Sequence, residues 1–91
     1  SYQAQAMDGK AAYIIKKLFD AFKDTPEQLP DTAICSFSIF AGLGLPYCRE
    51  QALGAIQGNK RILHRCIADY IGGMTDQFAY DEFDRLYGTR I

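Results

Sequence analysis

The 91-residue sequence has only one histidine, His64, and three cysteines that lie far apart. No two cysteines form a C-x-x-C pair, so the sequence indicates neither a disulfide framework nor a zinc site. His64 is followed by an arginine, and it has no set of converging partner ligands, so we expect an exposed or rim residue on the polar face of its helix. No serine lies in a G-x-S-x-G elbow. The sequence therefore predicts no catalytic residue, no metal ligand and no cofactor in this chain.

Long apolar runs and an excess of positive charge are also lacking. No segment approaches the ~20 apolar residues that cross a bilayer, which argues against a membrane partner. Ten basic and eleven acidic residues give a formal net charge of −1, so nucleic acid is not favoured as a partner either. Unpaired, widely spaced cysteines are typical of cytosolic proteins, and we expect a cytoplasmic location. The length allows one small domain, residues 1–91.

Three stretches carry the three-and-four spacing of apolar residues that is typical of amphipathic helices. They are residues 1–24 and the two halves of residues 59–88. Short helices are expected after Thr25, where Pro26 suits a first helical position, and at residues 47–58. The sequence thus predicts an all-α fold, a small helical bundle of three main helices plus short helices.

Residues 32–46 fit two interpretations. Alternation of apolar residues with Ser36 and Ser38 is typical of a strand, whereas Phe37 and Ala41 also follow a helical spacing. Because no other segment offers a partner strand, we favour a short helix or an irregular apolar segment there.

Residues suited to helix ends divide the last stretch into two helices. The expected caps are Asn59, Thr75 and Gly88. Gly73 lies in the short turn between the helices, and we expect it to take a positive φ or to allow the helices a close approach. On the last helix, Asp81 is spaced to pair with Arg85.

The turn also carries a family resemblance. From Arg65 to Ala79 the sequence reads R-x-x-x-D-Y-I-G-G-M-T-D-x-x-A. It resembles the signature near the C-terminus of dGTPase-like deoxynucleoside triphosphate triphosphohydrolases, which usually reads close to R-x-x-x-D-Y-I-A-G-M-T-D-R-Y-A. Gly72, Gln77 and Phe78 stand where alanine, arginine and tyrosine are usual.

The resemblance implies that the chain is the C-terminal, phosphohydrolase-associated domain of a longer HD-superfamily enzyme. Such enzymes cleave a deoxynucleoside triphosphate (dNTP) to a deoxynucleoside and triphosphate. In that family the metal is held by a histidine, a His-Asp pair and a further aspartate, all upstream of the signature. The implied partners are the catalytic HD domain of the same polypeptide, further copies in a homo-oligomer, and a dNTP and a divalent metal only in the full enzyme.

Four residues in or near the signature are candidates for substrate binding: Arg61, Arg65, Tyr70 and Asp76. The two arginines belong to a basic cluster, and a guanidinium matches phosphate oxygens in a bidentate way. Each candidate also has a structural interpretation. Arg65 is spaced to pair with Asp69, and Asp76 suits the first turn of a helix. The ring of Tyr70 falls on the apolar stripe, with its hydroxyl at the rim.

A second function stays open when the residues are considered without the resemblance. The chain could be a free-standing helical interaction module whose apolar faces bind a partner protein. An upstream H…HD…D pattern in the same open reading frame would favour the accessory domain of a hydrolase, whereas a reading frame that starts near Ser1 would favour the interaction module.

Overall fold

The structure is a computed structural model that describes residues 9–34 and 49–88. Its elements, in chain order, are α1 (Gly9–Asp24), η2 (Pro26–Gln28), α3 (Arg49–Gln57), α4 (Lys60–Gly72) and α5 (Asp76–Tyr87). Residues 31–34 are also helical, and neither described range contains a strand. The expected all-α fold of three main helices plus short helices is therefore confirmed. The interpretations of residues 1–8 and 35–46 lie outside the described residues.

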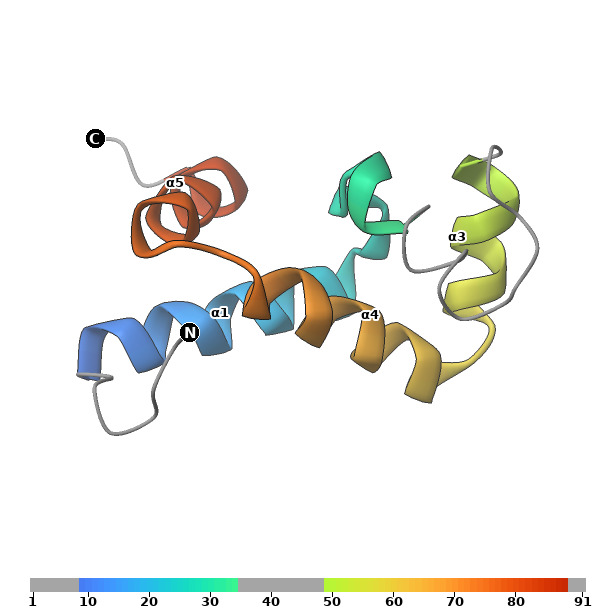
Figure 1. Cartoon of the computed structure of the whole chain (residues 1–91), viewed down its shortest axis with the longest axis horizontal. Helices are drawn as coiled ribbons and strands as arrows, with labels where there is room; N and C mark the ends of the chain where they lie inside the picture. The colour runs from blue at the N-terminus through green and yellow to red at the C-terminus, as the bar shows by residue number, and fades with distance from the viewer. Residues whose placement is uncertain (1–8, 35–48, 89–91) are drawn as a thin grey trace.

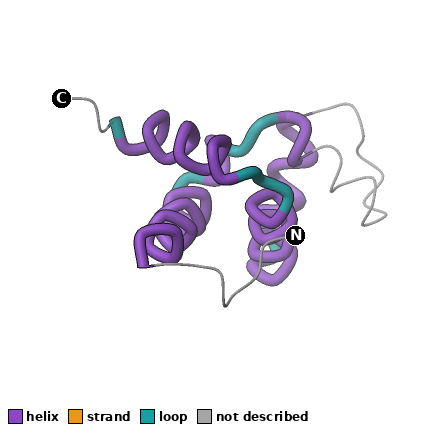
Figure 2. The backbone as a smooth tube through the Cα atoms, turned by 60° about the vertical axis from the view of Figure 1, so that its left-hand side comes forward, coloured by secondary structure: helices purple, strands orange, loops and turns teal. Residues whose placement is uncertain are grey.

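Helix α1 supports both helices of the signature region. α1 and α4 run side by side, and α5 lies across them toward one end (Figure 1). Figure 2 looks nearly along α1 and α4, so that α5 is seen crossing above them. At the other end of the molecule α3 packs against α4, and η2 packs against α1. Because α4 and α5 both rest on α1, this helix fixes how the two signature helices are placed.

The apolar residues of α1 recur at steps of four and form one buried stripe. Ile14, Leu18 and Phe22 are buried, the last two completely. The helix ends before Pro26, which disfavours a helical backbone in the preceding residue and opens η2 as expected. Although α1 is the longest helix of the described ranges, neither it nor any other helix there has the length and apolar character that a membrane crossing requires.

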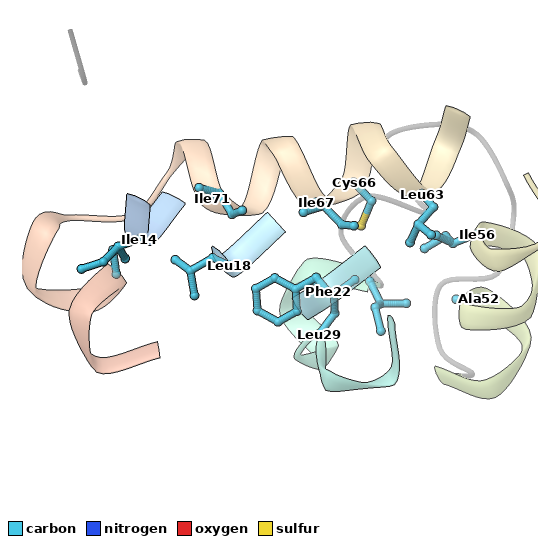
Figure 3. Packing of buried hydrophobic residues seen from close by; sticks show 12 residues of the cluster. Ile14, Leu18, Phe22, Leu29, Ala52, Ile56, Leu63, Cys66, Ile67 and Ile71 are labelled. Carbon is cyan, nitrogen blue, oxygen red and sulfur yellow. The ribbon is translucent and has the colours of Figure 1, made fainter. Parts of the chain in front are cut away.

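The core is a row of side chains between α1 and α4, shown in Figure 3. The buried side chains of α4 are Leu63, Cys66, Ile67 and Ile71. Those of α1 are Ile14, Leu18 and Phe22. Leu63 also lies beside Ile56, which brings α3 into the same core. Since full burial of one large apolar side chain contributes about 1.5–3 kcal/mol, this row is the main source of stability.

The three expected caps are confirmed. The side chain of Asn59 accepts a hydrogen bond from the backbone N–H of Arg61 at 3.0 Å. The hydroxyl of Thr75 accepts one from the N–H of Phe78 at 3.1 Å. Gly88, just past α5, has φ of 57°, in the left-handed region that favours glycine. Each cap satisfies backbone groups that a helix end leaves unpaired.

Gly73, between α4 and α5, does not have the backbone that we expected. Its φ is −91°, and a Cβ built there would lie 3.8 Å from the carbonyl oxygens of Asp69 and Tyr70, which is ordinary contact. Both proposed reasons for a glycine were therefore wrong. The N–H groups of Gly73 and Met74 donate to the carbonyls of Tyr70 and Ile71 at 3.3 and 3.0 Å. Such a tightened last turn needs no left-handed residue.

Candidate functional site

The four candidate residues lie on α4 and at the start of α5, and the structure does not bring them together at one point. Arg61 and Arg65 are four residues apart on an exposed face of α4. Tyr70 is turned about 140° from Arg65 around the helix, and its hydroxyl bonds to α5. Asp76 is exposed in the first turn of α5 and borders an apolar groove between α1, α4 and α5. The candidates therefore occupy three different surfaces.

Arg65 makes the expected ion pair with Asp69. Its Nε lies 3.4 Å from the Asp69 Oδ1, and the two side chains are 69% and 49% exposed. At this distance and exposure the pair is weak, and water competes for both groups. Arg65 is therefore held only loosely, and its guanidinium stays accessible to an anion.

The single histidine is half-buried rather than fully solvated. The ring of His64 meets the ring of Phe19 edge to face, with 5.5 Å between centroids. Its Nε2 is buried and has no hydrogen-bond partner within the described ranges. Those ranges also contain no group of three or more His, Cys, Asp or Glu side chains that could hold a metal ion. His64 thus packs against α1 at the rim of the core, whereas we expected it on the polar face of its helix.

The thiol of Cys66 is buried in the core and is unsuited to nucleophilic chemistry. Burial raises its pKa to about 11, and the negative charge of Asp69 adds to this effect. The Sγ donates weakly to the carbonyl oxygen of Ala33 at 3.7 Å. Because the thiolate is the reactive form of cysteine, Cys66 acts as a small apolar core residue.

A polar cluster around one buried carboxylate, that of Glu82, connects α4, α5 and η2. We call it the Glu82 cluster, and its members are Gln28, Tyr70, Glu82 and Arg85. The Glu82 carboxylate accepts a hydrogen bond from the Tyr70 hydroxyl at 2.8 Å, and bonds from Arg85 Nε and Nη2 at 2.6 and 3.0 Å. Arg85 also donates to the side-chain and backbone oxygens of Gln28, both at 3.3 Å. One guanidinium therefore ties the last helix to a turn 57 residues earlier.

The charges of this cluster stabilise one another. The hydrogen bond from Arg85 holds the pKa of Glu82 below its usual range, although burial acts in the opposite direction. Burial and the bond to the Glu82 carboxylate raise the pKa of the Tyr70 hydroxyl. The bond to Glu82 likewise raises the pKa of Arg85. The buried carboxylate is therefore ionised at neutral pH, and the Tyr70 hydroxyl remains a donor to it.

Sequence reasoning missed this cluster. The expected pair of Asp81 with Arg85 was wrong, since Arg85 turns to Glu82 and Asp81 accepts a hydrogen bond from Gln77 at 3.0 Å. One signal was present in the sequence. Glu82 follows the buried Ala79 by three residues, so it falls on the apolar stripe of its helix, where a carboxylate needs a buried partner.

An apolar groove of about 270 Å³ lies where α1, the end of α4 and the start of α5 meet. α1 contributes Ile14 and Ile15 among its lining residues, and α5 contributes Ala79 and Tyr80. Among the described residues that line the groove, Asp76 alone is charged. This described lining therefore suits apolar groups and contains no cation for a phosphate.

Comparison with known proteins agrees with the sequence signature. Residues 46–85 match the family model described as the phosphohydrolase-associated domain. Deoxyguanosinetriphosphate triphosphohydrolase-like proteins of Shewanella oneidensis, Geobacter metallireducens and Bordetella pertussis are 30%, 31% and 34% identical to the chain. These alignments cover 98%, 94% and 94% of the chain but only 17% of each relative.

The chain thus spans about one sixth of the length of the curated relatives that it matches. No solved structure gives a significant match. The resemblance read from the Arg65–Ala79 signature is confirmed, because the signature lies inside the matched segment. Residues 46–85 are thus similar to the phosphohydrolase-associated domain, and nearly the whole chain is similar to a part of deoxyguanosinetriphosphate triphosphohydrolase-like proteins.

Proposed function

We propose that this chain is the C-terminal accessory domain of a cytoplasmic dNTP triphosphohydrolase of the dGTPase type. The match of residues 46–85 to the phosphohydrolase-associated domain carries this proposal. Alignment of nearly the whole chain with a small part of much longer dGTPase-like proteins supports it. The catalytic HD portion of the same polypeptide would bind the divalent metal and the reacting phosphates.

The domain would act as a rigid support for that catalytic portion. Its α1–α4 core is closely packed, and the Glu82 cluster fixes α5 against η2. This rigidity would hold the exposed basic face of Arg61 and Arg65 in one orientation, toward the anionic nucleotide or the wall of its pocket. Tyr70, as a member of the Glu82 cluster, would position α5 rather than contact the substrate. Other exposed surfaces would serve the interfaces of a homo-oligomer.

The proposal is tested by measuring triphosphate release from dGTP and other dNTPs with added divalent metal. We expect turnover by a longer polypeptide that includes the upstream region, and none by the 91-residue chain alone. Cleavage of a phosphoester at neutral pH generally needs a metal or a comparable array of charges, and one histidine cannot build such an array.

Metal-dependent turnover by the short chain alone would contradict the accessory role. An open reading frame without an upstream H…HD…D pattern would also contradict it, and would favour the free-standing interaction module.

A further inference from the structure

We propose that the apolar groove between α1, α4 and α5 receives one or two apolar side chains from the upstream part of the same, longer polypeptide. The groove would be the surface by which the domain is attached to the catalytic portion. This inference rests on the proposed function, because it needs a longer polypeptide.

The size and lining of the groove favour side chains over a nucleotide. Its volume of about 270 Å³ lies below the roughly 300–1,000 Å³ of pockets that enclose drug-sized ligands. The residues that line it are Ala11, Ile14, Ile15, Phe19, Ala68, Ile71, Gly72, Met74, Thr75, Asp76, Ala79 and Tyr80. No lysine or arginine is among these described lining residues, so the lining itself gives a triphosphate no cationic partner.

The edge of the groove favours a protein partner. The ammonium of Lys10 lies 5.3 Å from the ring centroid of Tyr80, one of the lining residues. Asp76 lies in the lining as the first residue of α5. An apolar centre beside charges of both signs is the usual anatomy of a protein interface. A surface for an acidic ligand would instead collect positive charge alone.

The relatives are much longer than this chain, which favours a partner on the same polypeptide. One wall of the groove is α1, which lies outside the matched segment 46–85. The alignments nevertheless cover 94–98% of the chain, so they include α1 together with α4 and α5. In each relative most of the polypeptide lies outside this aligned region. A partner on the same polypeptide is present at high effective concentration, so a small groove is enough to hold it.

Two glycines allow a matched test of the groove. Gly72 lines the groove and Gly54 lies on α3, away from it, and a Cβ at either position would meet no atom of the described residues within 4 Å. A phenylalanine at either site should therefore leave the fold of the domain unchanged. Gly72→Phe would occupy the groove, whereas Gly54→Phe makes the same change of residue elsewhere.

The experiment places a photoreactive benzoyl-phenylalanine at position 10, beside the groove, or at position 23, an exposed lysine site farther along the same helix, and maps the cross-links of the longer polypeptide by mass spectrometry. We expect position 10 to cross-link to upstream residues of the same molecule, with a yield several-fold above that of position 23. In melting experiments Gly72→Phe should lower the Tm of the longer polypeptide, and Gly54→Phe should not.

Two results would overturn the inference: cross-links from position 10 to a second copy, or equal yields from positions 10 and 23. Triphosphate release by the unsubstituted longer polypeptide, measured beside them, separates the two proposals. Turnover without the intramolecular cross-link means that the groove is not the attachment surface, while the accessory role stands. Absence of turnover would count against the accessory role itself.

Discussion

The ion pairs Arg65–Asp69 on α4 and Arg85–Glu82 on α5 look alike in the sequence but differ in their surroundings. Arg65 and Asp69 are 69% and 49% exposed, and their closest atoms are 3.4 Å apart. Glu82 is 8% exposed, and its oxygen lies 2.6 Å from the Nε of an Arg85 side chain that is 46% exposed. The first pair lies on one helix in water. In the second, the buried carboxylate also bonds to Tyr70 and the guanidinium also bonds to Gln28.

The two pairs carry the same charges, so their different burial determines how much each contributes to stability. An exposed pair contributes about 0–1 kcal/mol, because water screens it and two long side chains must be ordered. A buried pair adds little net stability against an apolar replacement, but removal of one partner leaves a charge without compensation. The Arg85–Glu82 pair should therefore be sensitive to single substitutions, and the Arg65–Asp69 pair should be almost indifferent to them.

The largest effect is expected for Arg85→Met. Within the described ranges, this substitution leaves the buried Glu82 carboxylate with the Tyr70 hydroxyl as its one side-chain donor, and it releases Gln28 from α5. We expect a loss of about 2–3 kcal/mol in the free energy of unfolding, below the upper range for broken buried pairs because Arg85 is partly exposed. Urea unfolding followed by circular dichroism measures this change.

The double variant Glu82→Gln/Arg85→Met is the control for this prediction. It removes the orphaned charge and keeps a side-chain acceptor for Tyr70, so it should be more stable than Arg85→Met alone. If the double variant is no more stable than Arg85→Met, the cost does not come from an uncompensated carboxylate.

A smaller effect is expected in the pH dependence of stability. Because Arg85 holds the pKa of Glu82 below its usual range, the stabilisation by Glu82 is complete above the unfolded pKa of about 4.3. It is lost as the pH falls through the lower, folded pKa. Wild type should exceed Glu82→Gln by about 1–2 kcal/mol near neutral pH, and this difference should shrink below about pH 5.

Asp69→Asn sharpens the comparison in the same pH series. Asp69 belongs to the exposed pair, so its variant should stay close to wild type at every pH. Thermal melts of the three proteins provide the measurement. A wild-type advantage over Glu82→Gln that grows on acidification would mean that the sign assigned to the Glu82 shift is wrong.

The helix ends could be predicted from sequence because each depends on neighbouring residues. Asn59 and Thr75 bond to backbone groups two or three residues ahead, and Gly88 adopts a backbone that suits glycine. The exposed pair of Arg65 with Asp69 was predictable for the same reason, since its spacing is one helical turn.

The Glu82 cluster and the groove could not be predicted in this way, because both depend on how distant segments pack. Arg85 meets Gln28 across 57 residues, and Arg49 reaches Asp31 across 18. Competition between nearby acids also matters. By spacing alone Arg85 could pair with Asp81 or with Glu82. It pairs with Glu82, which is buried beside Tyr70, and the spacing of residues does not predict this burial.

The smallest effect on stability is expected for Arg65→Gln. Its partner Asp69 lies four residues toward the C-terminus, which is the less favourable order for a helical ion pair, and both groups are open to water. We expect the free energy of unfolding to change by less than about 0.5 kcal/mol.

In the longer polypeptide of the proposed function, however, Arg65 would belong to the basic face directed at the nucleotide. There Arg65→Gln should raise KM for dGTP several-fold with kcat nearly unchanged, because it removes charge attraction that is similar in the ground and transition states. Lys23→Gln on the exposed side of α1 is the matched loss of one positive charge and should leave KM unchanged. Equal KM values for the two variants would remove Arg65 from the substrate-binding face, and a large loss of stability would show that its pair with Asp69 is stronger than its exposure implies.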